Sequence, residues 1–393
     1  MQRSIRMAKL SMLAAIVVVG LAACGGTSGK SSSSGKSAKS AKTVPVAQTG
    51  RATGFTSALF VNAVGLTHQA GTATRPVVGP DDMAYLGGHI FVGFQNGVGS
   101  MGEASPLGKD STIVEFDLQG HKIAQWDVVG KNDGLGADPA TNRLIATVNE
   151  DGNSSVYLID PTAGSAPVHY HYSGKLPDGG GTDAISVHNG AVLITASAPD
   201  SKVKSAPAVY RVNFDSARHV ATFHEVFTDV AKASVANTRQ STSGQSRRLA
   251  LTDPDSSAMV PAFATRFAGD YVLDSQGDDE QIFAHNPGAS NQSLSVLKLS
   301  ASVDDAAWVA DPSGAIYTTD NVGDAIHKIT GPFVKGSELV AVTPCNDNAA
   351  PSTCPGPGYP QNYLGQLDPQ TGAITPIAVH GAATAPKGML FVP

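Results

Sequence analysis

Three aspartates open segments of the same design along this chain, and acidic groups gathered at one end of a repeated unit can bind cations. Asp82, Asp183 and Asp305 each precede a strand-like run, a glycine-containing turn and a second, more apolar run. If the units surround an axis, the three carboxylates meet at one channel mouth, where their oxygens suit Ca²⁺ or another divalent cation. A cationic ligand is an alternative, and so is turn capping through hydrogen bonds to backbone N–H groups.

The same register assigns the matching positions of the other segments to Gly136, Ser257 and Lys387. We therefore predict a candidate ligand site at the channel mouth, formed by Asp82, Asp183, Ser257, Asp305 and Lys387, in which the three aspartates would hold any metal. The chain contains no Gly-x-Ser-x-Gly elbow, no His-Glu-x-x-His motif and no phosphate-binding loop. No catalytic residue can be named from the sequence.

The elements that would position these residues are short β-strands. Runs such as "HIFVGF", "RLIATVN", "AVLITAS" and "AIYTTDN" recur about every ten residues, each bounded by Gly, Pro, Asn or Asp. The best helical candidate, residues 227–234, is short. This pattern favours an antiparallel all-β fold.

The strand-like runs repeat in groups of four with a period of about 50 residues, which is typical of a β-propeller. We predict full blades over residues 82–128, 134–172, 183–226, 256–299 and 305–342. The segments "DPATNRLIATVNEDGNSSVYLIDPTAG" and "DPSGAIYTTDNVGDAIHKI" resemble NHL- and YVTN-type propeller repeats: Asp-Pro, a turn residue, an apolar strand, Asn or Asp, and a second apolar strand. The resemblance covers roughly residues 76–393 and implies a propeller.

The two ends of this region are expected to complete one mixed blade and close the ring. "TSALFVNAV", which includes Ser57, is a spare strand-like segment before the first full blade, and "APKGMLFV" near the C-terminus looks like an opening strand. Five full blades and this composite give six. Seven are expected instead if residues 230–252 or 344–361 contain further strands.

The N-terminus has the layout of an export signal: Arg3, Arg6 and Lys9, and then an apolar run from Leu10 to Gly20. The following "LAAC" resembles the lipobox of bacterial lipoproteins, which implies cleavage before Cys24 and acylation of its thiol. An ordinary secretory signal is the alternative. We expect residues 1–23 to be the signal peptide, residues 24–50 a lipidated cysteine with a disordered Ser/Gly/Lys tether, and residues 51–393 the propeller.

Charge argues against a nucleic-acid-binding role, and cysteine usage agrees with an exported protein. From residue 44 onward the chain has 20 basic and 33 acidic residues, a net charge near −13, which differs from the basic footprint of nucleic-acid-binding proteins. Cys345 and Cys354 are the only cysteines after Cys24, and in an oxidising compartment we predict that they form a disulfide.

These features favour a monomeric, lipid-anchored binding or scaffold module. It would act on the outer face of the cytoplasmic membrane, in the periplasm or at the cell surface, with a protein, glycan or small ligand as partner. The alternative is a metal-dependent hydrolase or lactonase that uses the channel carboxylates. Gluconolactonase-like propellers have a related architecture and a Glu/Asn/Asp metal site, but here the first full blade opens with Gly79-Pro80-Asp81-Asp82 in place of Glu-Gly-Pro.

Overall fold

The computed structural model describes residues 54–393 except 163, 178–179, 198–204, 345–361 and 383, all within one compact unit, Thr49–Pro393. The predictions for the signal peptide, for Cys24 and its tether, and for the Cys345–Cys354 disulfide lie outside these residues. Within them, no helix has the length and apolar character needed to cross a bilayer.

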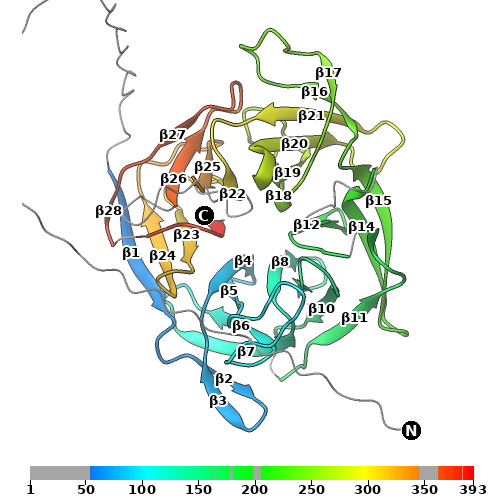
Figure 1. The fold of residues 1–393 in the computed structure, drawn as a ribbon. Helices are drawn as coiled ribbons and strands as arrows, with labels where there is room; N and C mark the ends of the chain where they lie inside the picture. The colour runs from blue at the N-terminus through cyan, green and yellow to red at the C-terminus, as the bar shows by residue number, and fades with distance from the viewer. Residues whose placement is uncertain (1–53, 163, 178–179, 198–204, 345–361, 383) are drawn as a thin grey trace, which may run out of the picture. The chain divides into compact units, whose positions relative to one another are not determined.

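The first three blades follow one another along the chain, each built from four antiparallel strands (Figure 1). Blade 1 contains β4 (Pro80–Leu86), β5 (His89–Phe94), β6 (Asp110–Phe116) and β7 (Lys122–Val129). Blade 2 contains β8 (Asn132–Asp138), β9 (Arg143–Val148), β10 (Ser155–Ile159) and β11 (Val168–Tyr172). Blade 3 contains β12 (Ile185–His188), β13 (Ala191–Thr195), β14 (Pro207–Asp215) and β15 (Val220–Thr228). Parallel pairing of β11 with β15 joins blades 2 and 3 at their outer edges.

The remaining blades have extra strands or strands from distant parts of the chain. Blade 4 contains β18 (Pro254–Met259), β19 (Tyr271–Ser275), β20 (Glu280–His285) and β21 (Ser293–Lys298), with β16 (Lys232–Val235) and β17 (Ser246–Arg248) at its outer edge. Blade 5 contains β22 (Val303–Trp308), β25 (Glu338–Val342), β26 (Tyr363–Leu367) and β27 (Ile374–Pro376). Blade 6 contains β29 (Met389–Val392), β23 (Ala315–Asp320), β24 (Ala325–Thr330), β1 (Phe55–Asn62) and β28 (Val379–Gly381). A hairpin of β2 (Thr67–Ala70) and β3 (Ala73–Pro76) precedes blade 1.

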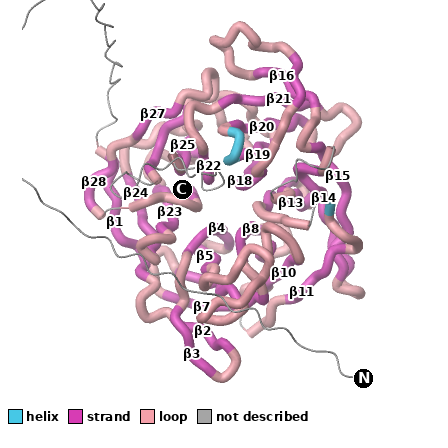
Figure 2. The backbone as a smooth tube through the Cα atoms, viewed as in Figure 1, coloured by secondary structure: helices cyan, strands magenta, loops and turns pink. Residues whose placement is uncertain are grey.

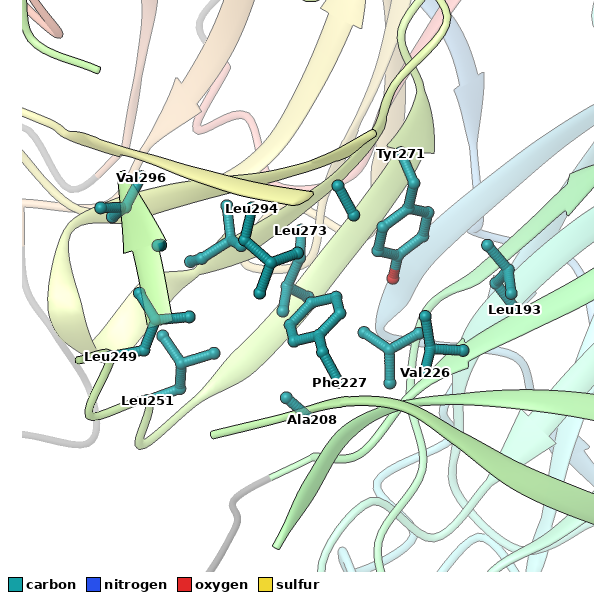
Figure 3. Close-up of a cluster of buried hydrophobic side chains, with 14 of the residues drawn as sticks. Leu193, Ala208, Val226, Phe227, Leu249, Leu251, Tyr271, Leu273, Leu294 and Val296 are labelled. Atoms are coloured by element: carbon teal, nitrogen blue, oxygen red, sulfur yellow. The ribbon is translucent and has the colours of Figure 1, made fainter. Parts of the chain in front are cut away.

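Six apolar cores, one between each pair of neighbouring blades, close the ring. In the core between blades 3 and 4, Phe227 and Val226 pack with Leu273 and Tyr271 (Figure 3). Equivalent clusters fill the other five interfaces, including the one between blade 6 and blade 1. Because a single small sheet cannot bury both of its faces, each blade needs both neighbours, and burial of these faces stabilises the closed ring. The prediction of a six-bladed all-β propeller is confirmed.

The prediction for the fifth blade is wrong in one respect. Residues 305–342 do not form one sheet: β22 pairs with β25, whereas β23 and β24, which lie between them in sequence, pair in blade 6. The chain thus enters blade 5, builds the centre of blade 6 and returns. Two chain crossings, one from β22 to β23 and one from β24 to β25, therefore connect blades 5 and 6 covalently.

Blade 6 contains both ends of the described chain, as predicted. β29 pairs with β23 on the channel side, and β1 pairs with β24 on the outside. Gly388, just before β29, allows this closure, since a Cβ atom there would lie only 2.4 Å from the backbone oxygen of Asp81 in blade 1. Phe55 at the start of β1 is buried and packs edge-on against Phe333, with ring centroids 5.3 Å apart.

Two further expectations are corrected by the strand assignments. Residues 227–234 are not helical; they form the end of β15, a turn and the start of β16 (Figure 2). Residues 230–252 do contain strands, but β16 and β17 extend blade 4 through the parallel pairing of β16 with β21 and do not form a seventh blade.

Candidate functional site in the axial channel

Six residues occupy the same position at the entry to the six innermost strands. In blades 1, 2, 4 and 5 the pairing register shifts there, which marks a β-bulge. Blades 3 and 6 match each other closely: the backbone N–H of Asp183 donates to Thr195 at 3.1 Å, and that of Lys387 donates to Thr319 at 2.9 Å. We call these six residues the entry ring: Asp81, Asp133, Asp183, Asp255, Asp304 and Lys387.

The entry ring corrects the register predicted from sequence. Asp183 and Lys387 belong to it, as expected, but Asp82 and Asp305 lie one residue further along their strands and Ser257 lies two residues further. The four missed members are Asp81, Asp133, Asp255 and Asp304. The five ring aspartates share a sequence pattern that could have located them. Each is followed by Asp, Gly, Ala or Ser, in the segments "PDDM", "NDGL", "TDAI", "PDSS" and "VDDA".

Two adjoining cavities occupy the axis. The larger, which we call the channel cavity, has a volume of about 400 Å³ and follows the inner strands, with Asp82 and Asp305 at its inner end. The smaller, which we call the inner cavity, has a volume of about 20 Å³ and is bounded by the entry ring, Asp82 and Glu150. Asp82, Ala184 and Ser256 line both. Ser257 faces the channel cavity and its hydroxyl lies 3.0 Å from that of Ser186.

The inner cavity is strongly acidic. Seven of the described residues that line it carry carboxyl groups, and Lys387 is the one basic residue among them. The Lys387 ammonium contacts the Asp81 carboxylate and lies 3.9 Å from Oδ1 of Asp304. A second cation, Lys131, approaches from blade 2 and lies 2.8 Å from Oδ1 of Asp133. Lys131 also contacts Glu150, so Asp82, Asp183 and Asp255 are the three carboxylates of this cavity for which the described structure shows no ion pair.

Amide side chains connect some of the ring carboxylates. Nε2 of Gln95 donates to Asp81 and, at 2.9 Å, to Asp133, so it bridges blades 1 and 2. Nε2 of Gln276 donates to Oδ1 of Asp304 at 2.8 Å. These contacts hold three of the five ring aspartates in fixed positions.

Asp183 is different, because its carboxylate accepts no hydrogen bond from any residue that the structure describes, although only 6% of the residue is exposed. Oδ2 of buried Asp133 also has no partner among the described residues. An unsatisfied buried carboxylate oxygen is costly unless a proton, water or ligand meets it. Both groups line the inner cavity, which is therefore short of hydrogen-bond donors and of positive charge.

Burial and mutual repulsion shift the titration of these groups. Burial raises the pKa of Asp133 to about 8, and Glu150 adds to this shift. Burial also raises the pKa values of Asp82, Asp183, Asp255 and Asp305 well above the ordinary value. Burial alone would lower the pKa of Lys387, but Asp304, Asp81 and Asp255 raise it well above its usual value, so it stays charged.

A second buried acidic pair lies behind the ring, between blades 4 and 5. Asp274 on β19 accepts a hydrogen bond from Ser256 at 3.0 Å, and Glu338 on β25 accepts one from Gln281 at 2.5 Å. Burial, followed by repulsion from Glu338, raises the pKa of Asp274 to about 8, and burial raises that of Glu338 to about 7. Both groups therefore change protonation near neutral pH.

The predicted metal ligands do not converge in the way expected. Asp305 is committed to the backbone, since its Oδ2 accepts from Met389 at 2.6 Å and its Oδ1 accepts from Ala306 at 2.7 Å. In the part of the chain that the structure describes, no three His, Cys, Asp or Glu side chains are arranged to hold a metal ion. Asp82, Asp183 and Asp305 thus share one end of the channel without forming a metal-binding set.

Comparisons with known proteins find similarity only among solved structures, at low sequence identity. No family model and no curated protein matches it. A solved structure from Lactobacillus plantarum is 11% identical, covers 86% of this chain and 100% of its own, and has a TM-score of 0.42. A protein of unknown function from Bacteroides caccae is 10% identical over 85% of this chain and 97% of its own, with a TM-score of 0.43. A provisionally assigned gluconolactonase is 10% identical over 75% of this chain and 91% of its own, with a TM-score of 0.39.

Proposed function

We propose that this protein is an exported, lipid-anchored binding module whose ligand enters the axial channel of the propeller. The observation that supports the proposal is the channel cavity of about 400 Å³, which is within the size range of small-molecule sites and has polar groups gathered at one end of partly apolar walls. Among the described residues that line this cavity there is no three-residue set arranged to hold the metal that a metal-dependent hydrolase would need. Binding therefore fits the geometry better than hydrolysis.

Blocking the channel tests this proposal without knowledge of the ligand. Ser257→Phe places a ring in the cavity, and Val187→Trp does so from the neighbouring blade. We expect a fragment set of cationic, neutral and anionic compounds to give hits by ligand-observed NMR with the wild-type chain, and we expect both variants to lose most of them. Circular dichroism confirms that the variants remain folded.

Two results would contradict a binding role in the channel. Hits that bind both blocked variants as well as the wild type would place the ligand elsewhere. Metal-dependent turnover of lactone or ester substrates, lost in Asp183→Asn or Asp305→Asn variants that stay folded, would support the hydrolase alternative instead.

The proposed lipid anchor is tested separately, by substitution of Cys24. The lipobox-like "LAAC" supports acylation at this residue, and buried acyl chains hold a protein on a membrane because each methylene contributes about 0.8 kcal/mol. We expect Cys24→Ser to move the protein from the membrane fraction to the soluble fraction and to abolish labelling by a palmitate analogue. A Cys24→Ser protein that stays on the membrane and is still labelled would contradict the proposed anchor.

A further inference from the structure

The channel and inner cavities differ in size and chemistry, and together they define what can fill them. The inner cavity, about 20 Å³, is large enough for one water-sized group. The channel cavity is some twenty times larger in volume and is lined beyond its inner end by Met83, Leu135, Ile185, Ala258, Trp308 and Phe391. A molecule that fits both has a small head and an apolar body.

The head must be cationic and must donate hydrogen bonds. Seven carboxyl groups line the inner cavity against one ammonium, so an anionic head would be repelled. The carboxylate of Asp183 and Oδ2 of Asp133 have no donors among the described residues. At the junction of the two cavities, Oδ2 of Asp82 accepts from the backbone of Leu135 at 3.2 Å, and no described residue donates to its Oδ1.

From this arrangement we infer that the channel binds a small primary ammonium compound with an apolar body, oriented with its charged head between Asp82 and Asp183. A primary ammonium has three N–H donors and forms strong, charge-assisted hydrogen bonds to carboxylates. A bare divalent cation is a poorer match, because no three described acidic, His or Cys groups are arranged to coordinate one. This inference rests on the proposed function and specifies the ligand class of the same site.

Protons compete with such a ligand. The charged and titratable groups that line the inner cavity come from every blade: Asp81, Asp82, Asp133, Glu150, Asp183, Asp255, Asp304 and Lys387. Asp305 lines the adjoining end of the channel cavity, and Lys131 contacts Asp133 and Glu150. Burial and repulsion raise the pKa values of Asp82, Asp133 and Asp183, so part of this set binds protons near neutral pH. Binding of an ammonium head favours the ionised carboxylates and displaces these protons, and affinity rises between pH 6 and pH 8.

Calorimetric titration of 2-phenylethylammonium into the full chain in nonionic detergent tests the inference. We expect saturable binding at one site, tighter at pH 8 than at pH 6, with protons released on binding. Asp82→Asn keeps the acceptor for Leu135 but removes the charge, and it should weaken binding by about tenfold or more. Asp183→Asn serves as a second variant with the same expected direction. The matched control is Glu225→Gln, an exposed residue on β15, the outermost strand of blade 3, and this variant should bind like the wild type.

Parallel titrations with benzyl alcohol, phenylacetate and Ca²⁺ separate failure of this inference from failure of the proposed function. Equal or tighter binding of benzyl alcohol or phenylacetate, or binding of 2-phenylethylammonium that both aspartate variants leave unchanged, would overturn the ammonium assignment. Binding of Ca²⁺ alone, lost in the same variants, would overturn it in favour of an inorganic cation while the channel remains a ligand site. If no compound binds and the fragment set also gives no channel-dependent hits, the proposed function itself fails.

Discussion

Lys387→Met should destabilise the propeller strongly at pH 8 and much less at pH 5. Lys387 is the basic member of the entry ring, and its ammonium contacts Asp81 and lies 3.9 Å from Asp304. Removing one partner of a buried ion pair leaves uncompensated charge and typically costs about 3–5 kcal/mol. Burial raises the pKa values of Asp133 and Asp255, which line the same inner cavity, so these carboxyl groups take up protons as the pH falls and less uncompensated negative charge remains around the substituted position.

Urea unfolding of the full chain at the two pH values measures this effect. The matched control is Lys232→Met on β16, an exposed lysine at the outer edge of blade 4, for which we expect a change of less than about 0.5 kcal/mol at both pH values. An equal loss of stability at pH 5 and pH 8 would mean that Lys387 contributes through packing. No loss of stability at either pH would mean that the stability of the propeller does not depend on the charge of Lys387.

The second large effect is a fall in stability of the wild-type chain as pH rises from about 5 to 8.5. The pKa of Asp133 and of Asp274 is raised to about 8, and that of Glu338 to about 7. A carboxyl whose pKa is higher in the folded state binds its proton more tightly there, so its contribution to stability is fully present below the unfolded pKa and is lost as pH rises through the folded pKa. The cations Lys131 and Lys387 have raised pKa values and stay charged across this range.

We expect the free energy of unfolding to fall by roughly 2 kcal/mol or more between pH 5.5 and pH 8.5, since one pKa unit corresponds to about 1.4 kcal/mol per group. Glu338→Gln removes one titrating group while keeping an acceptor for Gln281, and it should flatten the dependence near pH 7. The control variant Glu225→Gln should leave the pH dependence of the free energy of unfolding as it is in the wild type. A free energy of unfolding that stays level or rises over this interval would contradict the assignment of these groups as buried and protonated.

The fold could be predicted from the sequence because its main determinants are local. Alternating apolar runs, Gly- and Asn-containing turns and the 50-residue period define four of the blades within a few residues of their observed bounds. The mixed closing blade could also be anticipated, since each end of the region has a strand with no local partner. Both predictions depend only on segments that are close in sequence: strands that pair with the next strand along the chain, and end strands that have no such partner.

The exchange between blades 5 and 6 could not be predicted in this way. β22, β23, β24 and β25 all carry the same apolar strand pattern, so the sequence alone does not tell whether β23 pairs with β22 or with β29. Pairing between elements separated by about 70 residues depends on packing against blades that the local pattern does not describe. β29 fits beside β23 because Gly388 permits close approach to Asp81.

The candidate site was found only in part because a bulge changes the register by one residue. Strand patterns locate the entry to each inner strand, and they correctly gave Asp183 and Lys387. In blades 1 and 5 two aspartates stand side by side, Asp81-Asp82 and Asp304-Asp305, and only the bulge decides which of the two belongs to the entry ring. Bulges depend on cross-strand pairing, so the choice required the structure.

Crystals soaked with 2-(4-bromophenyl)ethylammonium test the central claim most directly, because the bromine marks the position of the ligand through its anomalous signal. We predict one bromine peak in the channel cavity among the apolar side chains, with the ammonium density against Asp82 and Asp183. A bromine peak at the propeller surface, or an empty channel at concentrations that saturate binding in solution, would contradict it.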